Sequence, residues 1–592
     1  MVYYSFDNKK KICVMRTIVE ESMLGKAWVL AVDSSPQSED NDLIRAILSN
    51  RGITESVEIQ KFLNPAIKES MPDPYVLKDM DAAARIVSDA IIAGKKIAVF
   101  GDYDVDGITS TAIVVKYLRA IDVGVVWHLP DREVEGYGLN ADAIKDFAEQ
   151  GAEVLISVDC GISGVNEVAL AKQLGMQVVI TDHHNPDRNL PAADAIVNPK
   201  RADDGSGLNY LAGVGVAFMF LVALNRELRN AGRETQNMNL MDCLDLVALG
   251  TICDTMPLIG LNRAFVATGL KVLDLRQNIG LRALMEIAGV KKSSVYAAGF
   301  AIGPRLNAAG RLDSAAPSLE LLLTDNVLIA RDLAEKLNKM NQERMDIQNR
   351  IMTAAIDMAD KCCASGKCSL MLCGDNWHGG VMGIIAGRLK DKYEMPSLVA
   401  TKSGDVINGS GRSIPGVDLG KIIHDALSAG LLSEGGGHAA AAGFTLPAEN
   451  ETAFCEFLEA AVMEQLKGIE SSNETVADAE LDASAAGMNL VRELSYLAPF
   501  GQGNPEPLLI LNGGTIAWAS TMGNGDHIRG NIRTSKGDML QFAGFNLTAT
   551  KVGEFLLDDS NINRKIKLLG KLKENEYNGR VSAQFIIEDV AV

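Results

Sequence analysis

Apolar runs alternate with amphipathic segments through the first half of the chain. Four apolar runs predict strands, at residues 96–100, 154–158, 177–181 and 244–251. Between them, residues 80–93 and 140–149 have the three- and four-residue spacing of helices. Alternating strands and helices are typical of an α/β domain with a mainly parallel sheet. We expect such a domain from about residue 78 to residue 269, after a short helical stretch within residues 1–75.

The pattern changes twice farther along the chain. Residues 317–364 are nearly free of Gly and Pro and repeat apolar positions at helical steps, which predicts a long amphipathic helix or a helix pair joining two lobes. Residues 366–468 predict a second α/β lobe, with strands at 369–373 and 397–400 and helices at 380–393 and 418–429. After residue 477, short strands predict a small β-barrel, at residues 510–511, 515–519, 527–532, 539–543, 566–571 and 580–587.

Length and composition fit several packed domains. The chain has 592 residues, of which 47% are hydrophobic. It has no uncharged apolar run long enough to cross a bilayer, and Lys9, Lys10 and Lys11 precede only a short apolar run without the core of a signal peptide. We therefore expect a cytoplasmic protein that does not associate with membranes.

The nine cysteines predict reduced thiols. Their number is odd and most lie in apolar segments. Four of them cluster, but without the spacing of a zinc knuckle, so we do not expect zinc at Cys362, Cys363, Cys368 and Cys373.

Acidic and imidazole side chains follow the four predicted strands. Asp102, Asp104 and Asp106 precede Gly107, and three more clusters follow at Asp159, at Asp182-His183-His184 and at Asp254. Because ligands in open α/β sheets gather at the carboxyl ends of the strands, we expect these clusters to converge. Residues two apart face one side of an extended segment, so the three aspartates of the first cluster would share a face.

Each cluster alone has a simpler interpretation. An Asp-rich turn is commonly a solvated loop or helix cap, and a His-His pair is more often structural than ligating. Recurrence after four predicted strands, in a chain with seven histidines, favours metal binding. Oxygen ligands with some imidazole suit Mn²⁺ or Mg²⁺, and a pair of such ions stabilises the attacking and leaving oxygens of a phosphoryl displacement. Phosphodiester hydrolysis is thus the first chemistry to consider.

Charge and aromatic content leave the substrate open. A net charge of −19 lacks the usual basic signature of nucleic-acid binding, but carboxylates that bind metals contribute to that sum and a local basic groove can coexist with it. Aromatic residues make up 5% of the chain, which does not suggest extended base stacking. Tyr137 and Phe500 are each interpreted as a stacking residue or a core residue.

The motifs resemble those of a known superfamily. Residues 99–107, 159–161, 182–184 and 254–257 resemble the motifs of the DHH phosphoesterases. Residues 136–140, 303–311, 409–413 and 435–443 narrow the resemblance to the RecJ family of bacterial single-strand-specific 5′ to 3′ exonucleases. The resemblance extends from about residue 75 to the C-terminus.

The resemblance implies two divalent ions, Mn²⁺ or Mg²⁺. One would be held by aspartates of the first motif and the other by His183 and Asp254, with Asp159 bridging. The implied metal ligands are Asp102, Asp104, Asp106, Asp159, His183 and Asp254. The implied catalytic set is Asp104, Asp106, Asp159, His183, His184 and Asp254. His184 and Asp102 would orient other ligands or bind metal themselves, and Asp182 would be structural.

The second lobe is expected to hold a DNA end. Its Gly-rich segments, interpreted as turns, offer a hydroxyl, a guanidinium and backbone amides to a 5′-phosphate. The candidate substrate-binding residues of this lobe are Ser410, Arg412, Gly436, Gly437 and His438. Those of the segment between the lobes are Arg305, Asn307 and Arg311. Without the resemblance, tight corners would be the preferred interpretation of these segments. His378 either caps a helix or contacts phosphate.

The resemblance also implies a division of the chain into domains with separate roles. The expected division is an N-terminal extension and cap (1–75), a DHH metal-binding catalytic domain (76–270), a helical connector (271–365), a DHHA1 domain binding phosphate and the DNA end (366–470), and an OB-like single-strand-binding domain (471–592). The implied function is two-metal exonuclease activity that releases 5′-mononucleotides from single-stranded DNA in repair and recombination. We expect a monomer, with a RecQ-type helicase and single-strand-binding protein as implied partners.

Two other classes of function are compatible with parts of the sequence. One is a DHH phosphodiesterase acting on short oligonucleotides or cyclic dinucleotides, which would not need residues beyond about 470. The other is a catalytically silent scaffold, which is disfavoured because such proteins usually lose metal ligands and none is missing here.

Overall fold

The computed structural model describes residues 14–32, 43–132, 134–187, 189–233, 235, 238–468 and 473–592. The lysine run at residues 9–11 and Cys13 lie outside the described residues, as does part of the predicted N-terminal extension. The described chain forms two compact units. The first comprises residues 71–256 and 268–468, and the second comprises residues 14–70, 257–267 and 473–592, with the gaps given above.

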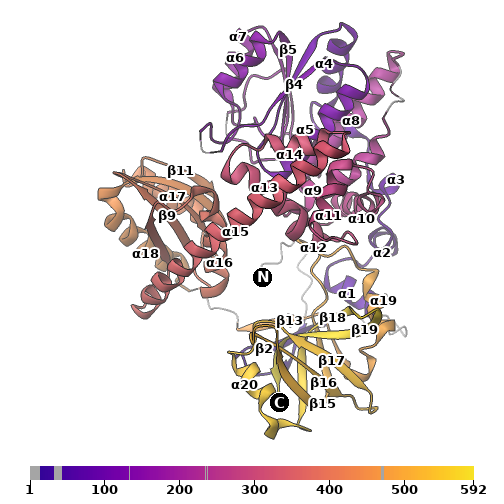
Figure 1. Cartoon of the computed structure of the whole chain (residues 1–592), viewed down its shortest axis with the longest axis vertical. Coiled ribbons are helices and arrows are strands. Elements are labelled where there is room, and N and C mark those ends of the chain that lie inside the picture. Colours follow the sequence, from indigo (N-terminus) through magenta and orange to yellow (C-terminus); the bar gives the residue numbers. More distant parts are fainter. Residues whose placement is uncertain are drawn as a thin grey trace. The chain divides into compact units, whose positions relative to one another are not determined.

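A five-stranded parallel sheet begins the first unit, in the order β4-β3-β5-β6-β7. Its strands are β3 (Lys96–Phe100), β4 (Val125–His128), β5 (Ala152–Val158), β6 (Gln177–Thr181) and β7 (Ala195–Val197). Helices cover both faces: α6 (Ala141–Glu149) and α7 (Val165–Gln173) on one, and α4 (Met80–Ile92), α5 (Val105–Ala120) and α8 (Gly213–Asn230) on the other (Figure 1). Burial on both faces explains why the strands are apolar runs. The first three predicted strands are confirmed.

The fourth predicted strand, at residues 244–251, is wrong, because these residues belong to helix α9 (Leu244–Cys253). Every residue from 244 to 252 is buried, so no polar face marks the helical period. A short apolar run then looks the same in a buried helix and in a buried strand. Since α9 packs against α5 and α8, its last turn still lies near the strand ends.

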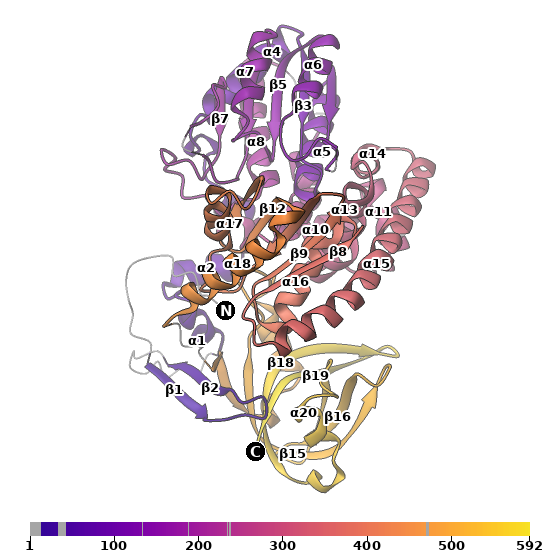
Figure 2. The same cartoon turned by 90° about the vertical axis from the view of Figure 1, so that its left-hand side faces the viewer.

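The connector is a helix pair, as predicted. After α10 (Gly260–Leu275) and α11 (Ile279–Ile287), the chain forms a helical segment of three parts: α12 (Val295–Ala297), the π-helical turn η3 (Ala298–Ile302) and α13 (Gly303–Leu312). The pair itself is α14 (Ala316–Leu323) and α15 (Val327–Ala364). Helix α15 contacts α11, α13 and α14 of the first lobe and also contacts the second lobe, so it joins the two (Figure 2).

The second lobe is built on a mixed sheet in the order β11-β12-β10-β9-β8. Only β8 (Leu370–Asp375) and β9 (Ser397–Ser403) pair in parallel, while β10 (Val406–Arg412), β11 (Glu434–His438) and β12 (Ala441–Pro447) pair antiparallel. Helices α16 (Gly379–Tyr393), α17 (Leu419–Ser428) and α18 (Glu451–Leu466) complete the lobe. The predicted strands and helices of this lobe are confirmed.

The prediction that residues 409–413 and 435–438 are turns is wrong, because they lie mainly in strands β10 and β11. Their glycines allow close packing within the sheet. A Cβ added to Gly409 would lie 2.1 Å from the ring of Phe444, and one added to Gly435 would lie 2.6 Å from Ile423. Glycine in a strand often marks such a close approach, which a turn-based reading of the sequence does not consider.

The second unit contains the predicted β-barrel. Its sheet runs β14-β15-β16-β17-β19-β18, and an additional pairing of β15 with β18 closes the ring. The strands are β14 (Ala479–Asp482), β15 (Leu509–Met522), β16 (His527–Arg533), β17 (Met539–Gly544), β18 (Lys565–Tyr577) and β19 (Arg580–Ala591). The two predicted strands at residues 510–511 and 515–519 are parts of β15. Phe500 is partly buried against the barrel core, which favours its interpretation as a core residue.

The N-terminal segment belongs to this second unit. Strands β1 (Val14–Val19) and β2 (Ala27–Val32) form a small sheet with β13 (Glu474–Ala477). The predicted helical stretch is α1 (Leu43–Asn50), α2 (Ser56–Leu63) and α3 (Ile67–Ser70). The eight cysteines within the described chain are free. Among the described residues, we find no helix with the length and apolarity needed to span a membrane.

Candidate metal centre and phosphate-binding region

Carboxylates and histidines from three strand ends and one helix end lie in one mostly buried cluster. Three groups of side chains each bring potential ligand atoms within 4.8 Å of one another: Asp102, Asp104 and Asp159; Asp159, His183 and His184; and Asp106, His183 and Asp254. Asp159 and His183 each belong to two groups. The structure thus brings together every residue of the implied metal and catalytic sets.

The first motif reaches this cluster through the start of α5. Asp104 caps the helix, and its Oδ1 accepts hydrogen bonds from the amides of Asp106 (2.8 Å) and Gly107 (3.1 Å). The carboxylate of Asp106 accepts from the amides of Gly213 (2.7 Å) and Val214 (2.9 Å) at the start of α8. The prediction that the three aspartates share one face of an extended segment is wrong, because α5 begins at Val105. Asp104 and Asp106 therefore fall into different ligand groups.

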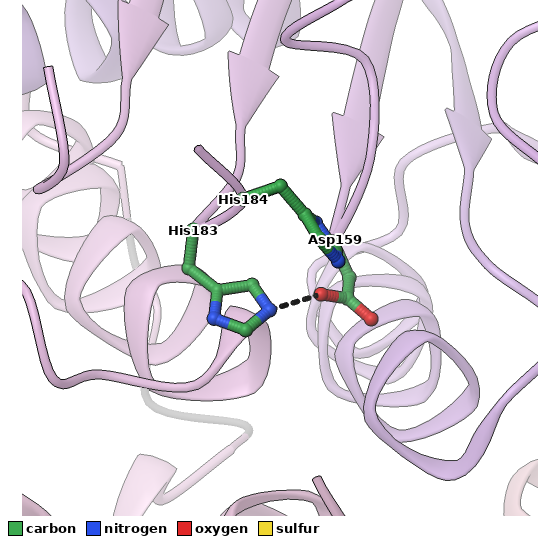
Figure 3. Close-up of side chains that lie close together, drawn as sticks. All are labelled: Asp159, His183 and His184. Carbon is green, nitrogen blue, oxygen red and sulfur yellow. Dashed lines mark ion pairs between the residues drawn. The ribbon is translucent and has the colours of Figure 1, made fainter. Parts of the chain in front are cut away.

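His183 presents a lone pair to the carboxylates. Its Nδ1 lies 3.1 Å from the carbonyl oxygen of Leu211, and its Nε2 lies 3.1 Å from Oδ1 of Asp159 (Figure 3) and 3.7 Å from Oδ2 of Asp254. Burial and the neighbouring His184 lower the pKa of His183 to about 3, so the ring is neutral. With the hydrogen on Nδ1 donated to Leu211, the lone pair of Nε2 faces carboxylate oxygens. Two such acceptors repel each other unless a cation lies between them.

The carboxylates also lack partners suited to their burial. Asp102 and Asp159 each have a buried Oδ1 with no hydrogen-bond partner. Burial, followed by the charges of neighbouring aspartates, raises the pKa of Asp102, Asp159 and Asp254 well above the usual range and that of Asp106 to about 7. Buried unpaired carboxylates are costly, and bound divalent cations would remove the cost. Carboxylate oxygens with imidazole nitrogen fit Mn²⁺ or Mg²⁺.

A second layer fixes the ligand loop. The buried carboxylate of Asp182 accepts from the amides of Ile162 (3.0 Å), His183 (2.6 Å) and His184 (3.0 Å) and pairs with Nδ1 of His184 at 2.8 Å. Burial lowers the pKa of His184, but the hydrogen bond and charge of Asp182 outweigh it and raise the pKa to about 9. The hydroxyl of Tyr137 also lies 2.9 Å from Nδ1 of His184. These contacts favour orienting roles for His184 and Tyr137 and a structural role for Asp182.

Cationic side chains gather in the same unit. On β10, Nη1 of Arg412 donates to Oγ of Ser410 (3.2 Å) and to the carbonyl of Gly411 (2.8 Å). Nη1 of Arg311 donates to the carbonyl of Gly380 on α16 at 2.9 Å. Burial lowers the pKa of Arg412 and lowers that of Arg311 to about 10, and the charge of Arg132 adds to both effects. Guanidinium groups held close together have the charge and the donors suited to an anion such as phosphate.

The other predicted substrate residues have mixed placements. Gly436, Gly437 and His438 lie on the exposed strand β11, where Nδ1 of His438 accepts from the amide of Ala440 (3.3 Å). Arg305 donates to the carbonyl of Ala301 within its own helical segment (2.7 Å) and to Oδ1 of Asn338 on α15 (3.0 Å). Oδ1 of Asn307 accepts from the amide of Val105 (3.2 Å), so Asn307 supports the first metal motif rather than the second lobe. His378 caps α16, where its Nδ1 accepts from the amide of Gly380 at 3.1 Å.

Two cations near the site were not predicted. Arg132 lies over the ring of Tyr103, with 5.4 Å between its Cζ and the ring centroid. Lys200 follows the buried Asn198, which donates to the carbonyl of His184 (2.9 Å) and accepts from the amide of Lys200 (2.8 Å). Burial lowers the pKa of Lys200, while the charges of Asp254, Asp182 and Asp159 oppose this shift. For Lys200, the available sequence signal is its position just after β7. A strand of three residues is too short to recognise from its pattern.

Family models match most of the chain. The N-terminal domain of the DHH family matches residues 96–251, the DHHA1 domain matches residues 362–464, and the RecJ OB domain matches residues 477–589. The chain is 35% identical over 563 residues to the single-stranded-DNA-specific exonuclease RecJ of Salmonella typhimurium, covering 93% of this chain and 95% of that protein. It is 34% identical over 563 residues to the protein of the same name from Escherichia coli, with the same coverage.

A solved structure agrees in fold. The crystal structure of RecJ in complex with Mn²⁺ from Thermus thermophilus superimposes with a TM-score of 0.77 at 29% identity, covering 93% of this chain and 76% of that chain. The Mg²⁺ complex from the same organism gives 0.71 at 27% identity, covering 93% and 74%. Both confirm the fold class expected from the sequence: two α/β lobes joined by a long helix, and a C-terminal OB-like barrel. The chain therefore belongs to the RecJ family of DHH phosphoesterases.

Proposed function

We propose that the protein is a single-stranded-DNA-specific 5′ to 3′ exonuclease that releases 5′-mononucleotides in DNA repair and recombination. The observation that carries the proposal is the sharing of ligands: Asp159 and His183 each belong to two of the three metal-binding groups. Such sharing fits two neighbouring divalent ions better than one. The curated relatives from Salmonella typhimurium and Escherichia coli bear this activity in their names.

The proposed ligand assignment follows the groups. Asp102 and Asp104 would hold one ion, and Asp106, His183 and Asp254 would hold the other. Asp159 would bridge them, since it shares one group with Asp102 and Asp104 and another with His183. When bound, the ions would activate water and stabilise charge on the attacking and leaving oxygens. In the same proposal, Asp182 and His184 keep the ligand loop in place, and Lys200 offers a cation to the phosphate that reacts.

The polarity of the enzyme would come from the cationic groups. Arg132, Arg311 and Arg412 form the charged part of a site for the terminal 5′-phosphate, and Ser410 contributes a hydroxyl. The exposed strand β11 adds Gly436, Gly437 and His438, and burial followed by the charges of Arg412 and Lys200 lowers the pKa of that histidine. A site for a terminal phosphate near the metal centre would select the first linkage of a strand.

The domain roles complete the proposal. Residues 76–270 would carry catalysis, residues 366–470 would bind the 5′-end, and residues 471–592 would bind the strand through the barrel. A RecQ-type helicase and single-strand-binding protein are its proposed partners, and the enzyme would act as a monomer in the cytoplasm, where its substrate lies. Co-purification with each partner, and the mass of the protein in solution, test these points.

Nuclease assays test the proposal directly. Strands labelled at either end, single or duplex, with a 5′-phosphate or a 5′-hydroxyl, are incubated with Mn²⁺, Mg²⁺ or chelator. We expect metal-dependent release of mononucleotides from the 5′-end of single strands and little release from blunt duplexes. Release from the 3′-end, or activity that survives chelation, would contradict the proposal. A dinucleotide preferred over long strands would instead support the short-substrate alternative.

A further inference from the structure

Two aromatic rings form an exposed flat surface on the first unit. Tyr296 and Phe300 are 73% and 71% exposed. Their ring centroids lie 5.0 Å apart with an interplanar angle of 24°, so the rings are stacked on each other. Burying large apolar side chains is favourable, so a contiguous pair left this exposed is a candidate binding surface.

This ring pair is attached to the helix that carries Asp254. Tyr296 and Phe300 belong to α12 and to the π-helical turn η3, which contacts α9. A Cβ added to Gly303, at the end of the turn, would lie 2.4 Å from Sγ of Cys253, the residue before Asp254. The thiol of Cys253 also lies 3.8 Å from the carbonyl of Ala298. Single π-helical turns occur frequently at functional sites, and here the turn presents the rings while its opposite side packs beside the metal centre.

The same segment continues along the metal centre. In α13, Asn307 accepts from the amide of Val105 in the first motif, and a Cβ added to Gly310 would lie 2.8 Å from the carbonyl oxygen of Tyr103. Arg311 at its end is bonded to the second lobe. The segment from residue 295 to residue 312 therefore leads from the rings, past the metal ligands, to the cations proposed to hold the 5′-phosphate.

We propose that Tyr296 and Phe300 form a stacking platform for bases of the uncleaved part of the single strand. The inference rests on the proposed function and deepens it by naming residues that hold the strand beyond the reacting linkage. Aromatic faces suit this role because every base offers a flat face, so the platform works on any sequence. A low overall aromatic content is no obstacle, since two rings at one place are sufficient.

The test replaces both rings by leucine (Y296L with F300L), which keeps apolar bulk and removes the flat faces. The measured quantity is the kcat/KM for a long 5′-phosphorylated single strand divided by that for a 5′-phosphorylated dinucleotide, which has a single nucleotide beyond the reacting linkage. We expect this ratio to fall about tenfold, as for the loss of one stacked base. The aromatic variant Y296F should keep the wild-type ratio. Leu328→Ala, which removes a 73% exposed side chain of the same unit, serves as the control and should also keep it.

Abasic scanning gives a second readout. Moving a single abasic nucleotide along the strand should reveal a position where wild type loses rate and the double leucine variant does not. If wild type cleaves both substrates but the leucine variant keeps the wild-type ratio, the platform is wrong while the proposed function stands. If wild type cleaves neither substrate, the proposed function fails first. If wild type self-associates and the leucine variant is monomeric, the rings contact a second copy of the chain, and the platform is overturned.

Discussion

The two lobes of the first unit place their candidate groups at different parts of a sheet. In the first lobe, most of the carboxylates and histidines follow the ends of parallel strands and are buried, and Asp102 and Asp159 each have a buried oxygen without a hydrogen-bond partner. In the second lobe, Ser410, Arg412 and the glycines of β11 lie within antiparallel strands, and β11 is the exposed edge strand of the sheet as described. The first lobe concentrates charged groups in a buried cluster. The second lobe offers the guanidinium of Arg412 on its central strand β10 and the backbone of the edge strand β11.

The difference shows that the two candidate sites are stabilised in opposite ways. The acidic cluster destabilises the fold until cations bind. The free energy of unfolding should therefore depend strongly on the metal concentration. The cationic region is anchored by ordinary hydrogen bonds, such as those of Arg412 and Arg311, and should be stable without ligand. Variants in the two lobes should therefore differ in how metal and DNA affect their stability.

The largest expected effect is that of Asp159→Asn. We expect kcat to fall by about a thousandfold or more, because the variant loses the charge of the proposed bridging ligand. Asp159 has a φ of +60°, a conformation that asparagine tolerates, so the fold should persist. Without metal, the melting temperature should stay level or rise, because one unpaired buried charge is gone. The stabilisation by added Mn²⁺ should shrink.

Asp245→Asn is the matched control for that experiment. Asp245 is equally buried but lies at the other end of α9 from Asp254, outside the potential ligand groups found among the described residues. It should keep nuclease activity and stabilisation by Mn²⁺. Retained activity in Asp159→Asn, or loss of metal response in both variants, would show that burial alone explains the shifted carboxylates.

Arg412→Gln tests the second lobe and should have the next largest effect. The variant loses a charge-assisted contact to the proposed 5′-phosphate, so the KM for 5′-phosphorylated strands should rise about tenfold to a hundredfold. The KM for 5′-hydroxyl strands and the response to Mn²⁺ should change little. Arg226→Gln, which removes a surface guanidinium paired with Asp73, is the control. An equal loss on both kinds of strand would place Arg412 elsewhere on the DNA path.

The sequence predicted the acidic site better than the cationic one, and the reason is physical. Polar residues directly after apolar runs mark strand ends, so Asp102, Asp159 and His183 stood out. The assignment of residues 244–251 failed only in element type, because a fully buried helix has no polar face. Gly436 and Gly437 were found as residues but assigned to a turn, since glycine favours turns and close-packed strands alike. Arg132 and Lys200 depend on tertiary packing and leave no local pattern.

Two adjacent glycines on β11 allow a further test of the second lobe, with a smaller expected effect than that of Arg412→Gln. A Cβ added to Gly437 would lie 2.4 Å from the carbonyl oxygen of Ala441, while one added to Gly436 would meet no atom within 4 Å. Gly437→Ala should therefore loosen β11 from β12 and destabilise the fold by about 1–3 kcal/mol, and Gly436→Ala should not. Thermal unfolding without metal and DNA measures both. Equal melting temperatures would mean that the edge strand adapts freely.

The smallest expected effect on nuclease activity is that of Asp245→Asn, which should change only the pH dependence of stability. Burial raises the pKa of Asp245 to about 6, against opposing contributions from the amide of Leu246 and from Lys116. The folded state therefore holds this proton more tightly than the unfolded state, where the pKa is close to 3.8. Below about pH 4 both states are protonated and the carboxyl costs nothing. As pH rises from about 4 to about 6, wild type loses stability that the asparagine variant keeps.

Chemical denaturation of wild type and Asp245→Asn across this pH range measures the difference in their free energies of unfolding. The carboxylates of the metal cluster are present in both proteins, so their contributions to this difference cancel. The variant should match wild type near pH 4 and exceed it by about 2–3 kcal/mol above pH 6. A difference that does not vary with pH would mean that Asp245 ionises normally despite its burial. With the expected result, a buried carboxylate outside the potential ligand groups of the described residues merely destabilises the fold. The grouping around Asp159 and His183, rather than burial itself, is then what makes the first lobe a metal centre.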